Sequence, residues 1–373
     1  MTTIIPPKTK SQLLRSFDVT DFPPVTGLEE EWRFTPVKRL GELITATALT
    51  GTAPAWHHAA LPPGVSVKES DAAEAILTPF DRVSALAHGS ATGVTLIEID
   101  AETTLDEPVV LVRKGEGGAA AGARTFVRVG NFAKVTLILS QTGQATLADN
   151  VEVVLGDSAQ LTFVTLAEWD AGAVQAQHVK FQVGKDARVQ HVQVALGGDV
   201  VRQFTSVEYA GRGGDAELWG IYFADAGQHL EHRQLVDHGV PDCRSYVGYR
   251  GALQGESAHT VWVGDVLIRA AATGTDTYEI NRNLVLTDGA RADSVPNLEI
   301  ETGEVAGAGH ASATGRFDDE QLFYLMSRGI GEAEARKLVV RGFFAELIGK
   351  IPSEELREHL GDAIESRLAK AGA

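Results

Sequence analysis

His310 is the residue whose type and setting best suit metal chemistry. It lies in a run of small residues, GEVAGAGHASATG, between the last predicted strand and the first helix of the tail. Because glycine and alanine leave the imidazole accessible, a neutral ring nitrogen of His310 can bind a transition-metal ion. A surface histidine without function is the simpler alternative, since histidine is common at partly exposed positions. Our hypothesis is that His310 is both a metal-binding and a cofactor-binding residue.

Cys243 and three further histidines are the other candidates. Cys243, in HGVPDCRS, is the single cysteine, which excludes an intramolecular disulfide and a multi-thiolate metal site. A lone cysteine in a β-rich segment is most often a small buried hydrophobe with a raised thiol pKa. The histidines His229, His232 and His238 lie close in sequence. If 228–234 form a strand, His229 and His232 point to opposite faces, so we interpret these histidines as polar ladders on the coil surface.

The composition narrows the class of protein. The 373 residues are 44% hydrophobic, enough for one large core or two modest ones. A net charge of −17 disfavours nucleic acids and anionic membranes as partners. No apolar run is long enough to span a membrane, and MTTIIPPKTKSQLL lacks the apolar centre of a signal peptide. We expect a cytoplasmic protein that binds neither nucleic acid nor membrane.

The middle of the chain reads as strands almost throughout. From about 93 to 300, apolar and polar residues alternate, as in Val94-x-Leu96-x-Glu98. No helical pattern of comparable length interrupts this region.

A weak repeat, Gly-x-x-Ala-x-(apolar or Thr), recurs in these strands. Its alanines lie 26, 28, 29 and 42 residues apart, and they are Ala133, Ala159, Ala187, Ala216 and Ala258. Such a period predicts stacked coils in which glycine forms the corner and alanine fits the narrow interior. A β-sandwich is the alternative, but hairpin turns such as Asn-Gly and Asp-Gly are nearly absent, which favours the solenoid.

Helical patterns occupy both ends of the chain. Near the N-terminus, helical patches are predicted at 37–48 and 71–87. The tail predicts three amphipathic helices: one that ends at Gly329, one from near Glu332 to before Pro352, and one from Ser353 onward. The predicted organisation is an N-terminal helical and irregular region, a β core and a C-terminal helical domain, at 1–92, 93–315 and 316–373.

The tail helices have two alternative roles. They can cap the last coil, as any solenoid requires, or they can dock a partner protein. Interfaces favour aromatic residues and arginine, so we predict that a partner protein binds the tail. We also predict that at least one of the two residues Phe343 and Phe344 fills the core of the helical domain. The predicted partner-binding residues are Leu322, Tyr324, Arg341, Phe343 and Phe344.

Several segments together resemble one known family. They are EEEWRFTP (29–36), DRVSALAHGSATGVTLIEI (81–99), NRNLVLTDGARADSVPNLEIETGEV (281–305), DDEQLFYLMSRGI (318–330) and RGFF (341–344). The chain resembles, over nearly its whole length, the SufB/SufD family of the SUF machinery that assembles iron–sulfur clusters. EEEWRFTP, PNLEI and the modest length favour the SufD branch.

This resemblance implies a fold, partners and a site. The fold would be mainly β with α-helical ends: a right-handed parallel β-helix flanked by an N-terminal helical region and a C-terminal helical domain. The β-helix would pair with SufB, the tail would dock the ATPase SufC, and His310 would match a histidine implicated in cluster assembly. The iron–sulfur cluster would be transient and lie at the interface with SufB, with none held stably by this chain alone. Expressed alone, without its paralogue, the chain could pair with a second copy of itself as a homodimer.

One departure from the family pattern bears on this site. Where many relatives have Cys-Ser-His, this chain has Ala308-Gly309-His310, so any thiolate ligand must come from elsewhere. The chain also lacks the GxxxxGK[ST] phosphate loop, so ATP hydrolysis must come from another subunit. We therefore expect a non-catalytic assembly subunit.

Two enzyme classes with similar folds remain as alternatives. A polysaccharide lyase or hydrolase needs carboxylates in one groove, and Asp149, Glu152 and Asp157 are acidic neighbours in sequence, but no Asp-Asp pair recurs at coil spacing. A hexapeptide-repeat acyltransferase would require a six-residue apolar period, which is absent.

Overall fold

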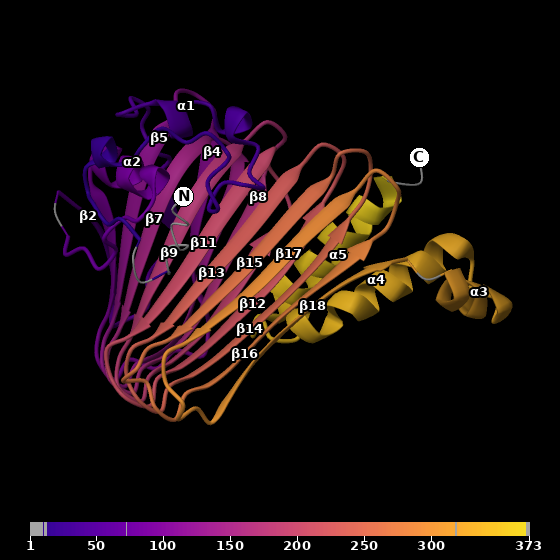
Figure 1. Ribbon diagram of the computed structural model, residues 1–373. Coiled ribbons are helices and arrows are strands. Elements are labelled where there is room, and N and C mark those ends of the chain that lie inside the picture. Colours follow the sequence, from indigo (N-terminus) through magenta and orange to yellow (C-terminus); the bar gives the residue numbers. More distant parts are fainter. Residues whose placement is uncertain (1–9, 11–12, 72, 318, 371–373) are drawn as a thin grey trace, which may run out of the picture.

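The chain winds into a solenoid with two faces. The computed structural model describes residues 10, 13–71, 73–317 and 319–370. Two nine-stranded sheets lie face to face, and from β3 to β18 the chain alternates between them (Figure 1). The predicted parallel β-helix between helical ends is thereby confirmed. The parallel pairing of consecutive coils excludes the β-sandwich alternative.

The two sheets are named here by what covers them. The tail sheet, covered by C-terminal helices, has the order β1 (Trp56–His58), β4 (Val109–Glu116), β6 (Lys134–Gln144), β8 (Gln160–Trp169), β10 (Arg188–Ala195), β12 (Asp215–Ala224), β14 (Arg244–Leu253), β16 (Asp276–Val285) and β18 (Gly307–Arg316). The head sheet, covered by the N-terminal region, has the order β17 (Arg291–Ile300), β15 (His259–Ile268), β13 (His229–His238), β11 (Val200–Tyr209), β9 (Val174–Val183), β7 (Thr146–Leu155), β5 (Ala121–Val129), β3 (Val94–Ile99) and β2 (Val65–Ser70). Among the strands of the described residues, only β1 with β4 and β2 with β3 pair antiparallel.

Alternation along each strand builds the core between the sheets. Val151 and Val153 on β7 are fully buried, and the rings of Phe163 and Phe181 meet edge to face with centroids 5.6 Å apart. Because side chains alternate between faces, every second residue of a strand enters this core while its neighbours face outward. The alternation seen in the sequence therefore predicts which residues of a strand enter the core and which face outward.

The corner turns explain the repeat and correct part of it. In several turns that lead into a strand of the tail sheet, a residue with positive φ is followed by a buried residue. Phe132, followed by Ala133, is an example. Ala159 and Ala187 take the same place one and two coils later, so the first three repeats are true equivalents. Ala216 instead pairs with Val189, two residues out of phase, and Ala258 lies at the opposite corner, before β15. The change of corner accounts for the irregular 42-residue spacing.

The N-terminal region covers the outer face of the head sheet. It contains the 3-10 helices η2 (Val19–Asp21) and η3 (Val37–Leu40), the short helix α1 (Glu42–Thr45) and α2 (Arg82–Ser90). The patch predicted at 37–48 is thus only two short helical segments. The patch predicted at 71–87 is wrong for its first half, because Asp81 caps α2 by accepting a hydrogen bond from the Ser84 backbone N–H at 2.7 Å.

The three predicted tail helices are present. They are α3 (Asp319–Ser327), α4 (Glu332–Ile348) and α5 (Glu354–Lys370), and Gly329 has the left-handed φ of +86° expected where a helix ends. Buried side chains of α4 and α5, such as Phe344 and Leu360, pack on the outer face of the tail sheet against Val192 and Ile221. In Figure 1 α3 stands away from the sheets. The helices therefore cover the side of the solenoid rather than its last coil, and the capping role is wrong.

Candidate functional site

The last coil presents an open edge. In the described part of the chain, β17 pairs only with β15 and β18 only with β16, so each strand has one free side. The backbone N–H and C=O groups on those free sides can accept a further strand. This open edge, formed by β17 and β18, is the setting of the candidate site.

His310 lies within β18 itself, not in a turn after it. It pairs in register with Glu279 of β16, which in turn lies in register with the buried Val247 of β14. The alternation that points Val247 inward therefore points Glu279 and His310 to the inner side of the coil. The side chain of His310 is 44% exposed, because no further coil covers it. The imidazole is accessible, as predicted, at the open edge.

Glu279 is the group beneath His310 that the sequence did not reveal. Its side chain is 1% exposed, and its Oε1 lies 3.8 Å from Nδ1 of His310. Neither carboxylate oxygen has a hydrogen-bond partner among the described residues. Burial, with a further contribution from the charge of Asp265, raises the pKa of Glu279 to about 8. Glycine at 264 makes room for this carboxylate, since a Cβ there would lie 2.3 Å from Oε2.

The number of donors at this site is small. Among the residues that the structure describes, no group of three or more His, Cys, Asp or Glu side chains is arranged to hold a metal ion. His310 and Glu279 supply one imidazole nitrogen and one carboxylate. An iron ion or cluster held here therefore needs further ligands from outside this chain.

Cys243 occupies a structural position. It follows Asp242, whose φ is +56°, and so takes the interior corner place that alanine takes at Ala133 and Ala159. Its side chain is fully buried, and burial raises the pKa of the thiol. The small buried hydrophobe predicted from the sequence is what the structure contains.

The histidines of β13 are split between the two faces, as predicted. His229 faces outward and contacts His259 and Glu231, each at 3.1 Å, whereas His232 faces inward between the rings of Tyr222 and Tyr249. Burial lowers the pKa of His232 to about 3. The predicted ladders on the coil surface are wrong in one respect, because these side chains are buried.

His238 also faces inward and is buried. It stacks on Tyr209, and its Nε2 lies 2.9 Å from the Ser245 hydroxyl. Burial lowers the pKa of His238 to about 4. The three histidines of β13 therefore make separate contacts and form no shared metal site.

The predicted partner-binding residues differ in how exposed their side chains are. Tyr324 and Arg341 are 57% and 60% exposed, and Arg341 forms an ion pair with Glu365 at 2.9 Å. Phe344 is fully buried beneath α4 and Leu322 is 7% exposed, so neither can be a surface contact, which corrects the prediction. Phe343 is partly buried against the same cluster. As expected, one of the two phenylalanines fills the helical core.

Other apolar side chains of the tail are exposed instead. Phe323 is 74% exposed, Met326 43% and Leu338 41%. Together with Tyr324, these four residues are called the tail patch below. Phe323 and Met326 are uncovered because α3 lies away from the sheets.

The carboxylates of the enzyme alternative do not share a groove. Asp149 points into the core and lies 3.1 Å from Arg113, while Glu152 faces outward and pairs with Arg124 at 3.0 Å. Asp157 lies in an exposed turn. Three carboxylates on different faces cannot act on one glycosidic bond.

A parallel β-helix with an open last coil, an accessible imidazole on that coil and a helical tail along its side is the class of protein defined here. The chain belongs to the family described as SUF system FeS cluster assembly, SufBD core domain, whose model matches residues 111–343. It is 54% identical to an iron–sulfur cluster assembly SufBD family protein of Mycobacterium tuberculosis, over 96% of this chain and 93% of that protein. The corresponding protein of Mycobacterium leprae is 48% identical over 96% and 94%.

Proteins named SufD match at lower identity. SufD of Escherichia coli is 25% identical over 76% of this chain and 69% of its own length. SufD of Bacillus subtilis is 30% identical over 58% and 49%. The family assignment is therefore firm and the SufD branch is in keeping with these matches. Among the described residues, no helix is both long and apolar enough to cross a membrane.

Proposed function

We propose that this chain is a non-catalytic, cytoplasmic scaffold subunit of a complex of the SufB, SufC and SufD type, in which iron–sulfur clusters are assembled. The observation that carries the proposal is the position of His310, on an unpaired strand and directly above a buried carboxylate without a hydrogen-bond partner. A metal ion bound by an imidazole on an open edge would have its remaining coordination positions on the side where a partner would lie.

The open edge suits a partner of the same fold. A homologous β-helix such as SufB can continue both sheets by adding its own last strands to β17 and β18. The added coil would cover the half-exposed His310 and supply the ligands that this chain lacks. With Ala308 in place of a cysteine two residues before His310, thiolates would have to come from SufB.

The tail patch suits a second partner. Four exposed apolar or aromatic side chains on neighbouring helices, with Arg328 stacked over Tyr324 at 5.1 Å, have the composition of an interface centre. The SufC ATPase would dock there. Because α4 and α5 are packed on the tail sheet, movement of the ATPases would be transmitted to the β-helix and its open edge.

The test of the proposal is the loss of iron and sulfide from the purified complex. We expect His310→Ala, co-expressed with its SufB and SufC partners, to assemble the same complex but to contain at least several-fold less iron and acid-labile sulfide. His359→Ala is the matched control, since His359 is a half-exposed histidine that contacts Glu168 far from the open edge. Unchanged iron and sulfide in the His310 variant would remove this residue from the function.

A further inference from the structure

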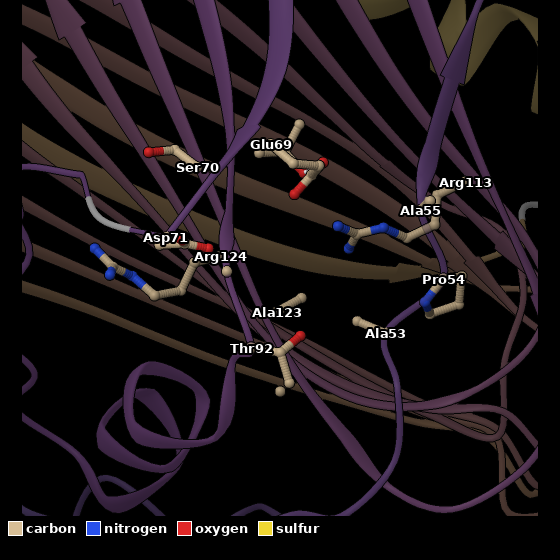
Figure 2. Close-up of a pocket in the computed structure, with 13 residues that line it drawn as sticks. Ala53, Pro54, Ala55, Glu69, Ser70, Asp71, Thr92, Arg113, Ala123 and Arg124 are labelled. Carbon is tan, nitrogen blue, oxygen red and sulfur yellow. Dashed lines mark hydrogen bonds between the residues drawn. The ribbon is translucent and has the colours of Figure 1, made fainter.

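A cavity lies at the end of the solenoid opposite to the open edge. Its volume is about 320 Å³, and it is lined by β2 to β5 together with the loop 53–55 (Figure 2). Along the tail sheet, β4 is seven strand steps from β18, which corresponds to roughly 34 Å. Any ligand in this cavity is therefore separate from the site at His310.

Arg113 supplies a buried positive charge to the cavity. The side chain is 2% exposed, its guanidinium stacks on Trp56 at 4.1 Å, and Nη1 lies 3.1 Å from Oδ2 of Asp149. Nε of Arg113 has no hydrogen-bond partner in the described chain. Figure 2 shows the guanidinium pointing into the open space. A guanidinium has five N–H donors, so the single ion pair with Asp149 leaves donors for a ligand.

Glu69 faces Arg113 from the other side. In Figure 2 its carboxylate points toward the Arg113 guanidinium across the cavity. Oε1 of Glu69 accepts a hydrogen bond from the Thr95 hydroxyl at 2.7 Å, which orients the carboxylate. No ion pair joins Glu69 to Arg113 in the part of the chain described here. Two opposite charges thus face one another across a space that can hold a small molecule.

We propose that this cavity binds a small zwitterion of the free α-amino acid class. The carboxylate of the ligand would accept hydrogen bonds from Arg113, and its ammonium group would donate to Glu69. Asp71 and Arg124 also line the cavity and lie beside one another in Figure 2, away from the space between Glu69 and Arg113, and Arg124 is paired with Glu152 at 3.0 Å. Ala53, Ala55 and Ala123 line the remaining wall and leave room for a small side chain. Arginine and glutamate held apart in this way favour a molecule with both charges over one with either alone.

Calorimetric titration of the full chain tests this assignment. L-Alanine, glycine and L-serine are the probes, with sodium acetate and methylammonium chloride as the two halves of the ligand. We expect saturable binding of at least one amino acid and binding weaker by about tenfold or more for each half. The absence of saturable binding by all three amino acids would overturn the proposal, and so would equal binding of acetate, which would indicate a simple anion site.

Two variants complete the test. Glu69→Gln is expected to weaken amino-acid binding by about tenfold or more, because it removes the charge that receives the ammonium group. Glu98→Gln is the control, since Glu98 lies on the neighbouring strand and pairs with Lys68 at 2.7 Å outside the cavity. Equal affinity of the Glu69 variant and the unaltered chain would overturn the proposal. Arg113 is not the first choice for substitution, because its removal leaves Asp149 buried without its ion pair.

Discussion

At the scale of single residues, Cys243 has a structural role. It stands where alanine stands in three other coils, so replacing it with alanine removes one buried sulfur and introduces no polar group. We expect Cys243→Ala to change the free energy of unfolding by only about 1 kcal/mol. The iron and sulfide content of the complex should be unaltered, as measured on co-purified material. A lowered cluster content at unchanged stability would contradict this role.

A buried histidine makes stability depend on pH. His232 is fully buried with a pKa of about 3, against the ordinary 6.5 that it regains on unfolding. Between these values the unfolded chain binds a proton that the folded chain excludes, so stability is lost as pH falls from about 6.5 toward 3, by about 1 kcal/mol per pH unit.

The variant His232→Gln isolates this contribution. We expect its free energy of unfolding, from urea titrations at several values of pH, to fall less steeply with acid than that of the unaltered chain. His359→Gln is the control, because His359 is 52% exposed. Parallel slopes for the His232 variant and the unaltered chain would contradict the prediction.

At the scale of elements, the tail divides into a packed part and a projecting part. Helices α4 and α5 are fixed by Phe344, Leu347 and Leu360 in a cluster with the tail sheet, whereas α3 exposes Phe323 and Tyr324. We expect the double variant Phe323→Asp, Tyr324→Ala to keep its melting temperature and to lose co-purification with the SufC ATPase. Deleting the whole tail would not discriminate, since it would also expose the tail sheet.

The control for the tail is an aromatic residue elsewhere. Phe132 is 60% exposed at a corner turn, so Phe132→Ser removes a similar apolar surface far from α3. Retention of SufC by the double variant, or its loss with Phe132→Ser, would contradict docking at the tail patch.

At the scale of the whole molecule, the open edge determines what the chain can join. A charge that points inward at a free strand opposes the addition of another strand. Ser312, exposed on β18, pairs in register with the buried Asn281 and shares its inward direction. We expect Ser312→Lys to leave the monomer folded but to reduce heterodimer formation with SufB by tenfold or more, as measured by light scattering after gel filtration. Undiminished pairing would argue against strand addition at this edge.

The sequence by itself determined the repeating part of this protein. Alternation fixes which side of a strand each residue takes, and glycine or alanine at a corner fixes where the chain turns, because both effects act within a few residues. The stacked coils, the three tail helices, the split of His229 from His232 and the burial of Cys243 followed from such local signals, whereas the parallel β-helix was what the family resemblance implied. The tertiary structure alone decided what covers each face. Glu279 lies beneath His310 because two coils stack 31 residues apart, and Phe344 is buried while Phe323 is exposed because only α4 and α5 reach the tail sheet. Contacts between segments distant in sequence depend on how whole elements pack, and no spacing within one segment encodes them.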